Sequence, residues 1–367
     1  MIDPTPDVPL GAHTTLQVGG TGRWGVTVES PEGLEPALRW AQTRDLPVLL
    51  LGGGSNMVVA DEGFPGLVVR LGFSGVRRQA ADGEVWLTVE AGHDWDALVA
   101  ATVEADLAGL ECLSGIPGQV GAAPIQNIGA YGQALEDTLV EVQAWDAMRQ
   151  CLVTLDAAAC AFGYRHSRFK ADLLEHGPGR WIITAVTLRL RPGAPATLAY
   201  GELARRFAGS SHVSVAEARA TVLDLRRGKS MVLDPNDPNS RSAGSFFTNP
   251  ITGPAQVEAI ARIVGEDPPQ WPMSDAADRI KLSAAWLIER AGLHKGLRRG
   301  PVGLSARHTL AIVTSPGAKA DDVACFAAGI RRRVHETFGI RLVPEPNFIG
   351  FPHDGDALLD AITPTSL

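Results

Sequence analysis

The chain has 367 residues, of which 45% are hydrophobic and 20% are charged, and its formal net charge at pH 7 is −8. A chain of this length is expected to form two or three domains, and the composition is typical of a globular protein. The acidic balance argues against a nucleic-acid partner, because no broad basic surface is expected, but it allows a local basic site for a small anion.

Cysteine usage and the N-terminal sequence indicate the compartment. The four cysteines contain no Cys-x-x-Cys pair and have no metal-type spacing with histidine, so we expect reduced thiols and no metal site. The N-terminus, MIDPTPDVPLGAH, has no basic region followed by an apolar one, and no apolar run approaches the roughly 20 residues of a membrane span. We therefore expect a cytoplasmic protein with no membrane association.

The first predicted elements are a helix that begins at Pro31, with apolar residues at helical spacing, and a strand at 47–51. The cluster Gly-Gly-Gly-Ser-Asn at 52–56 follows that strand and leads into a β-like run at 57–60. A Rossmann fingerprint would place a helix directly after its glycines. A Rossmann domain is therefore not expected here.

The remaining elements are predicted in chain order. Short strands are expected over 66–92, and Asp94 is placed as the N-cap of a helix from Trp95 to Glu104. Further strands are expected near 139–155 and 180–191, an excursion or linker at 193–212, helices at 216–227, 254–264, 283–291 and 319–337, and strands near 309–314 and 340–343. The part after about residue 216 is interpreted as a separate α/β lobe.

The most informative segment is GIPGQVGAAPIQNIGAYG at 115–132, which holds five glycines and no charged residue. A surface loop would normally carry charged residues, and a helix would not tolerate glycines this dense, so neither is expected here. Dense glycine brings backbone N–H groups close to a large, flat and partly anionic ligand, and the cluster at 52–56 follows the same logic. Two such loops indicate a dinucleotide held between two lobes.

Three other segments carry polar groups in small-residue or proline-rich settings: FGYRHS (162–167), SAGSFFTNP (242–250) and VPEPNFIG (343–350). Ser245 does not fit the G-x-S-x-G nucleophile elbow, and a serine in a turn is most often a local hydrogen-bonding group. Arg165 alone could be a surface charge, and Glu345 alone could be a turn residue.

Seven segments together resemble the UDP-N-acetylenolpyruvoylglucosamine reductase family, the flavoenzymes of peptidoglycan precursor synthesis. They are LGGGSN (51–56), GIPGQVGAAPIQNIGAYG (115–132), FGYRHS (162–167), AYGEL (199–203), AGSFFTNP (243–250), WLIERAGL (286–293) and PEPNFIG (344–350). They occur in the family's order between about Leu10 and Gly350, and Tyr200 in AYGEL is similar to the tyrosine loop of the type I branch.

The resemblance implies an α+β fold with a two-lobed FAD-binding module of the vanillyl-alcohol-oxidase-like kind and a C-terminal α/β substrate-binding lobe. The implied boundaries are 1–72 for the first FAD-binding lobe, with 343–367 returning to it, 73–215 for the second lobe with the Tyr200 loop, and 216–342 for the substrate-binding lobe.

The resemblance also implies the reaction and its catalytic residues. NADPH reduces FAD, and the flavin passes hydride to the enolpyruvyl group of UDP-N-acetylglucosamine enolpyruvate, giving UDP-N-acetylmuramate. Arg165 is expected to hold the substrate carboxylate, Glu345 to polarise the enolate when protonated, and Ser245 to donate the proton. Phe246 and Phe247 would exclude water or would be ordinary core residues.

Binding residues follow from the same motifs. FAD is expected to bind non-covalently, because Ser55 occupies the loop where some related oxidases carry a linking histidine. The residues expected around FAD are Gly52, Gly53, Gly54, Ser55, Asn56, Gly115, Ile116, Pro117, Gly118, Gly121 and Gln126. Those expected around the UDP-sugar are Tyr200, Arg226, Lys229, Asn249, Lys281 and His308. For Arg226, Lys229 and Lys281 the alternative interpretation is a solvated surface charge. Arg226 and Lys229 would share one helix face if the helix continues through both.

Alternatives remain at this point. A sugar or alcohol oxidase on the same flavin scaffold, a non-catalytic flavin- or UDP-sugar-binding protein, and a flavin-free dehydrogenase would each differ in the colour or reactivity of the preparation. The segment 230–238 is longer than in shorter type I relatives, and Asn347 stands where some relatives have a basic residue near the flavin. We expect a monomer with no obligatory protein partner.

Overall fold

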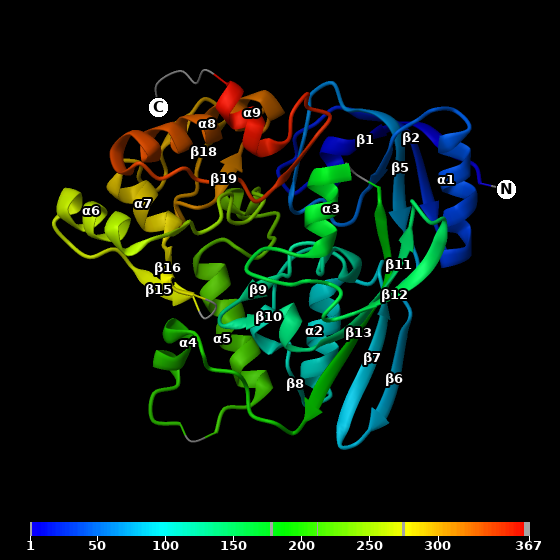
Figure 1. The fold of residues 1–367 in the computed structure, drawn as a ribbon, viewed down its shortest axis with the longest axis horizontal. Helices are drawn as coiled ribbons and strands as arrows, with labels where there is room; N and C mark the ends of the chain where they lie inside the picture. The colour runs from blue at the N-terminus through cyan, green and yellow to red at the C-terminus, as the bar shows by residue number, and fades with distance from the viewer. Residues whose placement is uncertain (1, 177–178, 211, 274–275, 363–367) are drawn as a thin grey trace. The chain divides into compact units, whose positions relative to one another are not determined.

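The computed structural model describes residues 2–176, 179–210, 212–273 and 276–362. Its contacts divide the chain into two compact units, each made of separate stretches. The first contains residues 1–8, 22–54 and 64–232, and the second contains 9–21, 55–63 and 233–367. Both units mix helices with sheets, as Figure 1 shows element by element.

The first unit opens with a small sheet in the order β1-β2-β5-β3, covered by one helix. The strands are β1 (Thr5–Pro9), β2 (Thr21–Val28), β5 (Phe64–Leu71) and β3 (Val48–Leu50), and both β2 and β3 run parallel to β5. Helix α1 (Leu34–Gln42) buries Leu34, Ala37 and Ala41 in the same cluster as Leu67 and Val69 of β5.

A larger antiparallel sheet forms the rest of the framework of the first unit. Its order is β12-β11-β13-β7-β6, and β8 (Leu107–Ala108) pairs with the end of β13. The strands are β6 (Val76–Ala81), β7 (Glu84–Glu90), β11 (Leu139–Asp146), β12 (Cys151–Asp156) and β13 (Trp181–Pro192). Alternate residues of β7 are buried, and helix α2 (Trp95–Glu104) packs its apolar side chains into the same cluster.

Smaller elements of the first unit follow in the chain. Two-residue strands β9 (Gly129–Ala130) and β10 (Gln133–Ala134) pair within the glycine-rich loop, and the helices are α3 (Arg168–His176), α4 (Gly201–Arg206) and α5 (Val215–Gly228).

The second unit is built around helix α8 (Ala320–Phe338), one face of which is buried over its whole length. The other helices are α6 (Pro254–Val264), α7 (Ala284–Arg290) and α9 (Gly355–Ala361). Three small sheets surround them: β14 (Ile251–Thr252) with β16 (Ala276–Leu282) and β15 (Gln270–Met273); β17 (Arg298–Arg299) with β18 (Val302–Leu304) and β19 (Ile312–Thr314); and β4 (Met57–Val59) with β20 (Asn347–Ile349).

Most elements predicted from the sequence are confirmed, with differences that have local causes. The strand expected near 340–343 is wrong: Leu342 is buried, but the ladder begins only at Asn347, since Pro344 and Pro346 lack the N–H that a strand interior needs. The linker expected at 193–212 contains α4, and residue 211 lies outside the described residues.

Domain boundaries are a separate question from the elements. The pairing of β20 with β4 brings the segment after Glu345 to residues 57–59, inside the second unit. Residues 363–367 of the predicted C-terminal return lie outside the described residues, and the three-part boundaries stay a prediction. No helix in the described ranges combines the length and apolarity needed to cross a membrane.

Candidate active site

The two glycine-rich loops meet inside the first unit. A Cβ atom added to Gly53 would lie 2.9 Å from the Cα of Gly118, closer than real Cβ atoms approach. Within the described ranges, the amide N–H groups of Gly52, Gly53 and Gly54 have no acceptor. Bare amides on a loop that excludes side chains are the donors that a diphosphate needs. These residues therefore fit a dinucleotide.

The loop at 115–132 is fixed to the start of α2 and the end of β7. The amides of Val120 and Gly121 donate to the carbonyls of His93 and Ala91 at 2.9 Å each. The Trp95 amide donates to the Gly118 carbonyl at 3.0 Å. Because both sides of the loop are tied to regular elements, its glycine backbone is held in one conformation. Ile116 packs on the adjoining core, whereas Pro117 and Gln126 are half-buried.

Arg165 lies at the far end of the same loop. Its guanidinium donates to the carbonyl oxygens of Gly129 at 2.7 Å and Asn127 at 3.4 Å, and it lies 5.5 Å from the ring centroid of Tyr164. The residue itself has a positive φ of 53°, which is uncommon for a side chain of this size. Loop carbonyls therefore orient the guanidinium.

A second polar group of the first unit joins Lys229 to the Tyr200 segment. The Lys229 ammonium lies 2.6 Å from the carboxylate of Glu202 and 5.6 Å from the ring of Tyr131. Tyr131 and Tyr200 pack edge to face with centroids 5.3 Å apart. Burial tends to lower the pKa of Lys229, but the Glu202 carboxylate beside it outweighs that effect and raises the pKa. Burial raises the pKa of Tyr131.

The helix does not continue through both Arg226 and Lys229, so the condition for a shared helix face is not met. Helix α5 ends at Gly228, and Lys229 is its C-cap with φ −101° and ψ 4°. Lys229 therefore leaves the helix and turns toward Glu202 and Tyr131, while Arg226 stays in the last turn of α5.

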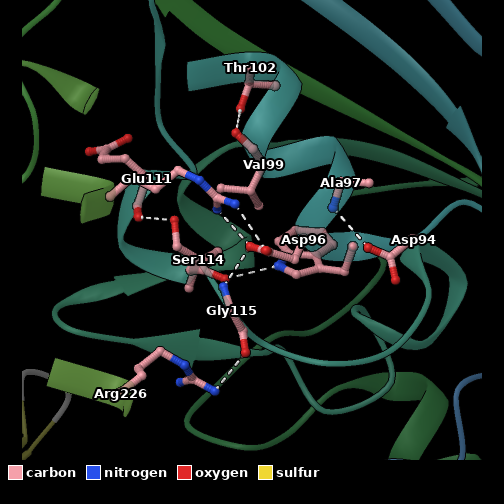
Figure 2. Close-up of polar contacts among 12 residues, drawn as sticks. Asp94, Asp96, Ala97, Val99, Thr102, Glu111, Ser114, Gly115 and Arg226 are labelled. Carbon is pink, nitrogen blue, oxygen red and sulfur yellow. Dashed lines mark hydrogen bonds and ion pairs between the residues drawn. The ribbon is translucent and has the colours of Figure 1, made fainter. Parts of the chain in front are cut away.

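Arg226 binds the backbone around the first glycine of the loop (Figure 2). Its guanidinium donates to the carbonyl oxygen of Gly115 at 3.0 Å. It also donates to the carbonyl oxygen of Met231 at 2.8 Å. Its Nε is buried and has no hydrogen-bond acceptor in the described part of the chain. Burial lowers the pKa of this guanidinium. A buried cationic donor with spare capacity is suited to an anionic ligand.

Two of the predicted catalytic residues come together in the second unit, although they are far apart in sequence. The amide of Glu345 donates to the carbonyl of Phe246 at 2.9 Å, so Glu345 lies beside the residue that follows Ser245. The side-chain amide of Asn56 donates to the backbone carbonyl of Glu345 at 3.3 Å. The backbone carbonyl of Asn56 accepts from the Asn347 amide at 3.0 Å. Asn56, Ser245 and Glu345 therefore share one neighbourhood.

The other residues predicted in the second unit have structural partners. Asn249 accepts the Ala284 amide at the start of α7 at 3.0 Å, and Lys281 lies 6.0 Å from the Trp271 ring. His308 is half-buried in the turn before β19. Phe246 and Phe247 are 0% and 1% exposed and belong to the main core of this unit, as the ordinary-core interpretation expects.

The structure thus groups the predicted residues by unit. The first unit holds Gly52, Gly53, Gly54, Gly115, Ile116, Pro117, Gly118, Gly121, Gln126, Arg165, Tyr200, Arg226 and Lys229. The second holds Ser55, Asn56, Ser245, Asn249, Lys281, His308 and Glu345. The convergence of Arg165 with Ser245 and Glu345 stays a prediction.

Three further residues of the first unit were not found from the sequence: Glu202 and Asp96, which contact predicted residues, and Arg219, which contacts Asp96. Glu202 lies in the AYGEL segment, but its partner Lys229 is 27 positions away, so no local pattern indicates the pair. Asp96 and Arg219 form a bidentate ion pair with N–O distances of 2.6 and 2.9 Å across 123 positions of sequence. No local pattern predicts such a pair.

Comparison with known proteins gives one consistent result. Residues 25–153 match a family model described as an FAD binding domain, and residues 235–349 match the C-terminal domain of UDP-N-acetylenolpyruvoylglucosamine reductase. The reductase of that name from Thermobifida fusca is 45% identical over 354 residues, covering 94% of this chain and 97% of the relative. That from Saccharopolyspora erythraea is 47% identical over 355 residues, covering 94% and 95%.

A solved structure agrees with the sequence relatives. The crystal structure of UDP-N-acetylenolpyruvylglucosamine reductase from Thermus caldophilus covers 95% of this chain and 100% of its own, with a TM-score of 0.63 and 30% identity. The predicted α+β architecture, an FAD-binding module followed by a C-terminal lobe, is confirmed by these matches.

Proposed function

This chain belongs to the UDP-N-acetylenolpyruvoylglucosamine reductase family, and from that premise we propose how its own residues carry out the reaction. It reduces the enolpyruvyl group of UDP-N-acetylglucosamine enolpyruvate to UDP-N-acetylmuramate, a step of peptidoglycan precursor synthesis. FAD, when bound, would supply the redox chemistry, namely the hydride for the substrate double bond, with NADPH as its source.

The glycine cluster and the loop at 115–132 hold the FAD. The amides of Gly52, Gly53 and Gly54, which have no acceptor among the described residues, would donate to the diphosphate, and at Gly53 the close approach of the Gly118 backbone leaves no room for a side chain. Ser55, Asn56 and the rest of the predicted set complete the binding residues. No histidine lies between His13 and His93 in the sequence, in keeping with non-covalent binding.

Arg165 and Glu345 stabilise the charge that develops on the substrate. Hydride addition to the terminal vinyl carbon pushes the electron pair of the double bond toward the neighbouring carboxylate, giving an enolate-like dianion. The planar fork of the Arg165 guanidinium, oriented by loop carbonyls, pairs with that carboxylate. Glu345 is the second residue proposed to polarise the same enolate.

Ser245 completes the addition by giving its hydroxyl proton to the carbon that carries the ether oxygen. One hydride and one proton are then added across the double bond, and the serine alkoxide regains a proton from solvent. A hydroxyl is a weak acid, but an enolate is a strong base, so the transfer is feasible when geometry is enforced.

Arg226 and Lys229 bind the substrate diphosphate, with Tyr200 covering the nucleotide. Tyr200 is 37% exposed and rests edge to face on Tyr131, and Lys229 is held at the same place by Glu202. Asn249, Lys281 and His308 are proposed as further substrate contacts. We also propose a monomeric cytoplasmic enzyme that needs no protein partner.

One observation carries the assignment of residues. The hydrogen bond from the Glu345 amide to the Phe246 carbonyl joins positions 99 residues apart, and this supports a shared role for Ser245 and Glu345. A family scaffold that had lost this chemistry would have no reason to retain all three of Ser245, Glu345 and Arg165 in its sequence.

The experiment is a spectroscopic one in two halves. The purified protein should be yellow and should bleach on anaerobic addition of NADPH, and the enolpyruvyl UDP-sugar should then restore the flavin absorbance without oxygen. A colourless protein, or a reduced flavin that reoxidises only with oxygen, would contradict the reductase function; the latter outcome would favour a sugar or alcohol oxidase.

A further inference from the structure

The peptide of Gly115 is held from both sides in the first unit (Figure 2). Its N–H donates to the Asp96 carboxylate at 2.6 Å, and its C=O accepts from the Arg226 guanidinium at 3.0 Å. Gly115 has φ +72°, and an added Cβ would lie 2.9 Å from Leu223 of α5. Two charged side chains therefore hydrogen-bond the backbone of Gly115, the first glycine of the loop, which also lies against α5.

Helix α5 supplies two arginines to these contacts, one paired with Asp96 and one bonded to Gly115. Arg219 forms the bidentate pair with Asp96, and Arg226 lies seven positions later, about two turns along the same face. The side chains of Arg219 and Asp96 are 16% and 35% exposed. The contacts thus form a closed ring from Asp96 to Gly115, from Gly115 to Arg226, and along α5 to Arg219, which pairs with Asp96.

The two arginines of this ring have different partners. Asp96 pairs directly with Arg219, whereas the hydrogen bonds of Arg226 go to neutral carbonyls. Burial raises the pKa of Asp96, but the hydrogen bonds from Arg219 and Gly115 outweigh that effect and hold its pKa below the usual value. The Asp96 carboxylate also acts on Arg226 through its charge, and the buried Nε of Arg226 has no acceptor among the described residues.

We propose that Asp96 is a positioning residue for substrate binding: through Gly115 and Arg219 it fixes the Arg226 guanidinium where it meets the diphosphate. Asp96 does not touch the substrate, and this role rests on the function proposed above. Ordering a charged side chain before the ligand arrives lowers the entropic cost of binding, so the effect belongs in substrate affinity and not in the chemical step.

The test uses the full-length holoenzyme with its FAD reduced by dithionite, so that NADPH binding does not enter. Single-turnover reoxidation by the enolpyruvyl UDP-sugar without oxygen gives a half-saturating concentration and a limiting rate. For Asp96→Asn we expect the half-saturating concentration to rise about tenfold, with the limiting rate changed by less than about threefold. Asn keeps an acceptor for Gly115 but gives up the bidentate charge pair.

Asp94→Asn is the matched control, because Asp94 is two positions away and its side chain, in the described part of the chain, caps α2 by accepting the Ala97 amide at 2.8 Å (Figure 2). Asn caps a helix about as well as Asp, so this variant should change the melting temperature little and leave the half-saturating concentration within about twofold. If Asp96→Asn changes only the melting temperature and leaves the half-saturating concentration within about twofold, Asp96 is merely structural and the proposal is overturned.

A double-mutant cycle makes the link to Arg226 explicit. The double variant Asp96→Asn with Arg226→Met should bind substrate no worse than Arg226→Met alone, since Asp96 acts only through that guanidinium. Additive losses would overturn the proposal. Should Asp96→Asn not fold, Arg219→Lys against Arg219→Gln gives the same answer: the cation-retaining variant should keep most of the affinity. An inactive wild-type enzyme would instead contradict the function itself.

Discussion

At the scale of single residues, the backbone directly after Ser245 is anchored independently of the Ser245 hydroxyl. The Phe246 amide donates to the Leu310 carbonyl at 2.7 Å, and the Phe246 carbonyl accepts from Glu345. Gly244 has φ +70° with open space around its Cβ position, so the turn needs glycine for conformation and not for room. Removing the Ser245 hydroxyl should therefore leave the turn intact.

We predict that Ser245→Ala separates the two half-reactions. Reduction of the flavin by NADPH should stay within about twofold, whereas reoxidation by the enolpyruvyl UDP-sugar should slow by about 10²–10⁴-fold, the range for a lost general acid. Stopped-flow absorbance of the flavin without oxygen measures both. Equal slowing of the two halves would show that Ser245 is not the proton donor.

At the scale of elements, the Tyr200 segment depends on a close backbone approach to the glycine-rich loop. A Cβ added to Gly132 would lie 2.9 Å from both the Cβ of Ala199 and the amide nitrogen of Tyr200, and Gly132 has φ +84°. Thr197, just before this segment, is tied down by the buried carboxylate of Glu111, which accepts its amide at 2.8 Å. The segment leading into α4 is thus fixed at Thr197 and packed at Tyr200.

We predict that Gly132→Ala weakens substrate binding by displacing Tyr200. The left-handed backbone alone costs about 1–2 kcal/mol for a residue with a Cβ, and the clash with Tyr200 adds to it. The KM for the UDP-sugar should rise several-fold while the FAD content of the purified protein stays unchanged.

Gly201→Ala is the natural control for that experiment, since Gly201 is the first residue of α4 and its Cβ position is open. Alanine there should be neutral or stabilise by about 0.4–1 kcal/mol. If both variants behave alike, the approach at Gly132 has no role in placing the Tyr200 segment.

At the scale of the whole molecule, elements with local signals could be predicted and those without could not. Asp94 was placed correctly as the N-cap of α2 because a cap is a short-range interaction. β6 lies within the short strands expected over 66–92, but its own bounds could not be predicted, since most of its residues are exposed and VRRQAA has no apolar alternation. The strand near 340–343 was wrongly predicted because apolar residues there are buried by loop packing and not by a ladder.

The candidate site divides in the same way. Family motifs supplied Ser245 and Glu345, and the hydrogen bond between their neighbouring backbones confirms that these segments meet. The Asp96–Arg219 pair joins α2 to α5 across 123 positions, and each member alone looks like a surface charge on an amphipathic helix. Only tertiary structure brings such groups together.

Acid stability is a property of the whole molecule to which each unit contributes an ion pair. In the first unit, Arg219 and Gly115 hold the pKa of Asp96 down despite its burial; in the second, the hydrogen bond from Arg341 lowers the pKa of Asp360. A carboxyl whose folded pKa is depressed stabilises the fold above its unfolded pKa of about 3.9, and that stabilisation is lost as the pH falls through the folded value. Asp321 works in the opposite direction, because burial and its acidic neighbours raise its pKa.

We therefore predict that the melting temperature is nearly constant from about pH 7 to pH 5 and falls below about pH 4. The variant Arg219→Gln measures how much the Asp96–Arg219 pair stabilises the fold. Because solvent screens a partly exposed pair, the variant should lose about 1 kcal/mol or less of unfolding free energy at neutral pH, roughly 2–4 °C in melting temperature. The difference from wild type should shrink as the pH falls below about 3.9, because the Asp96 carboxyl is then protonated in the unfolded state of both proteins. Thermal unfolding followed by circular dichroism measures this, with Arg341→Gln reporting on the second unit. A deficit for Arg219→Gln that is as large near pH 3 as near pH 7 would show that Arg219 stabilises the fold by packing and not by its charge pair with Asp96.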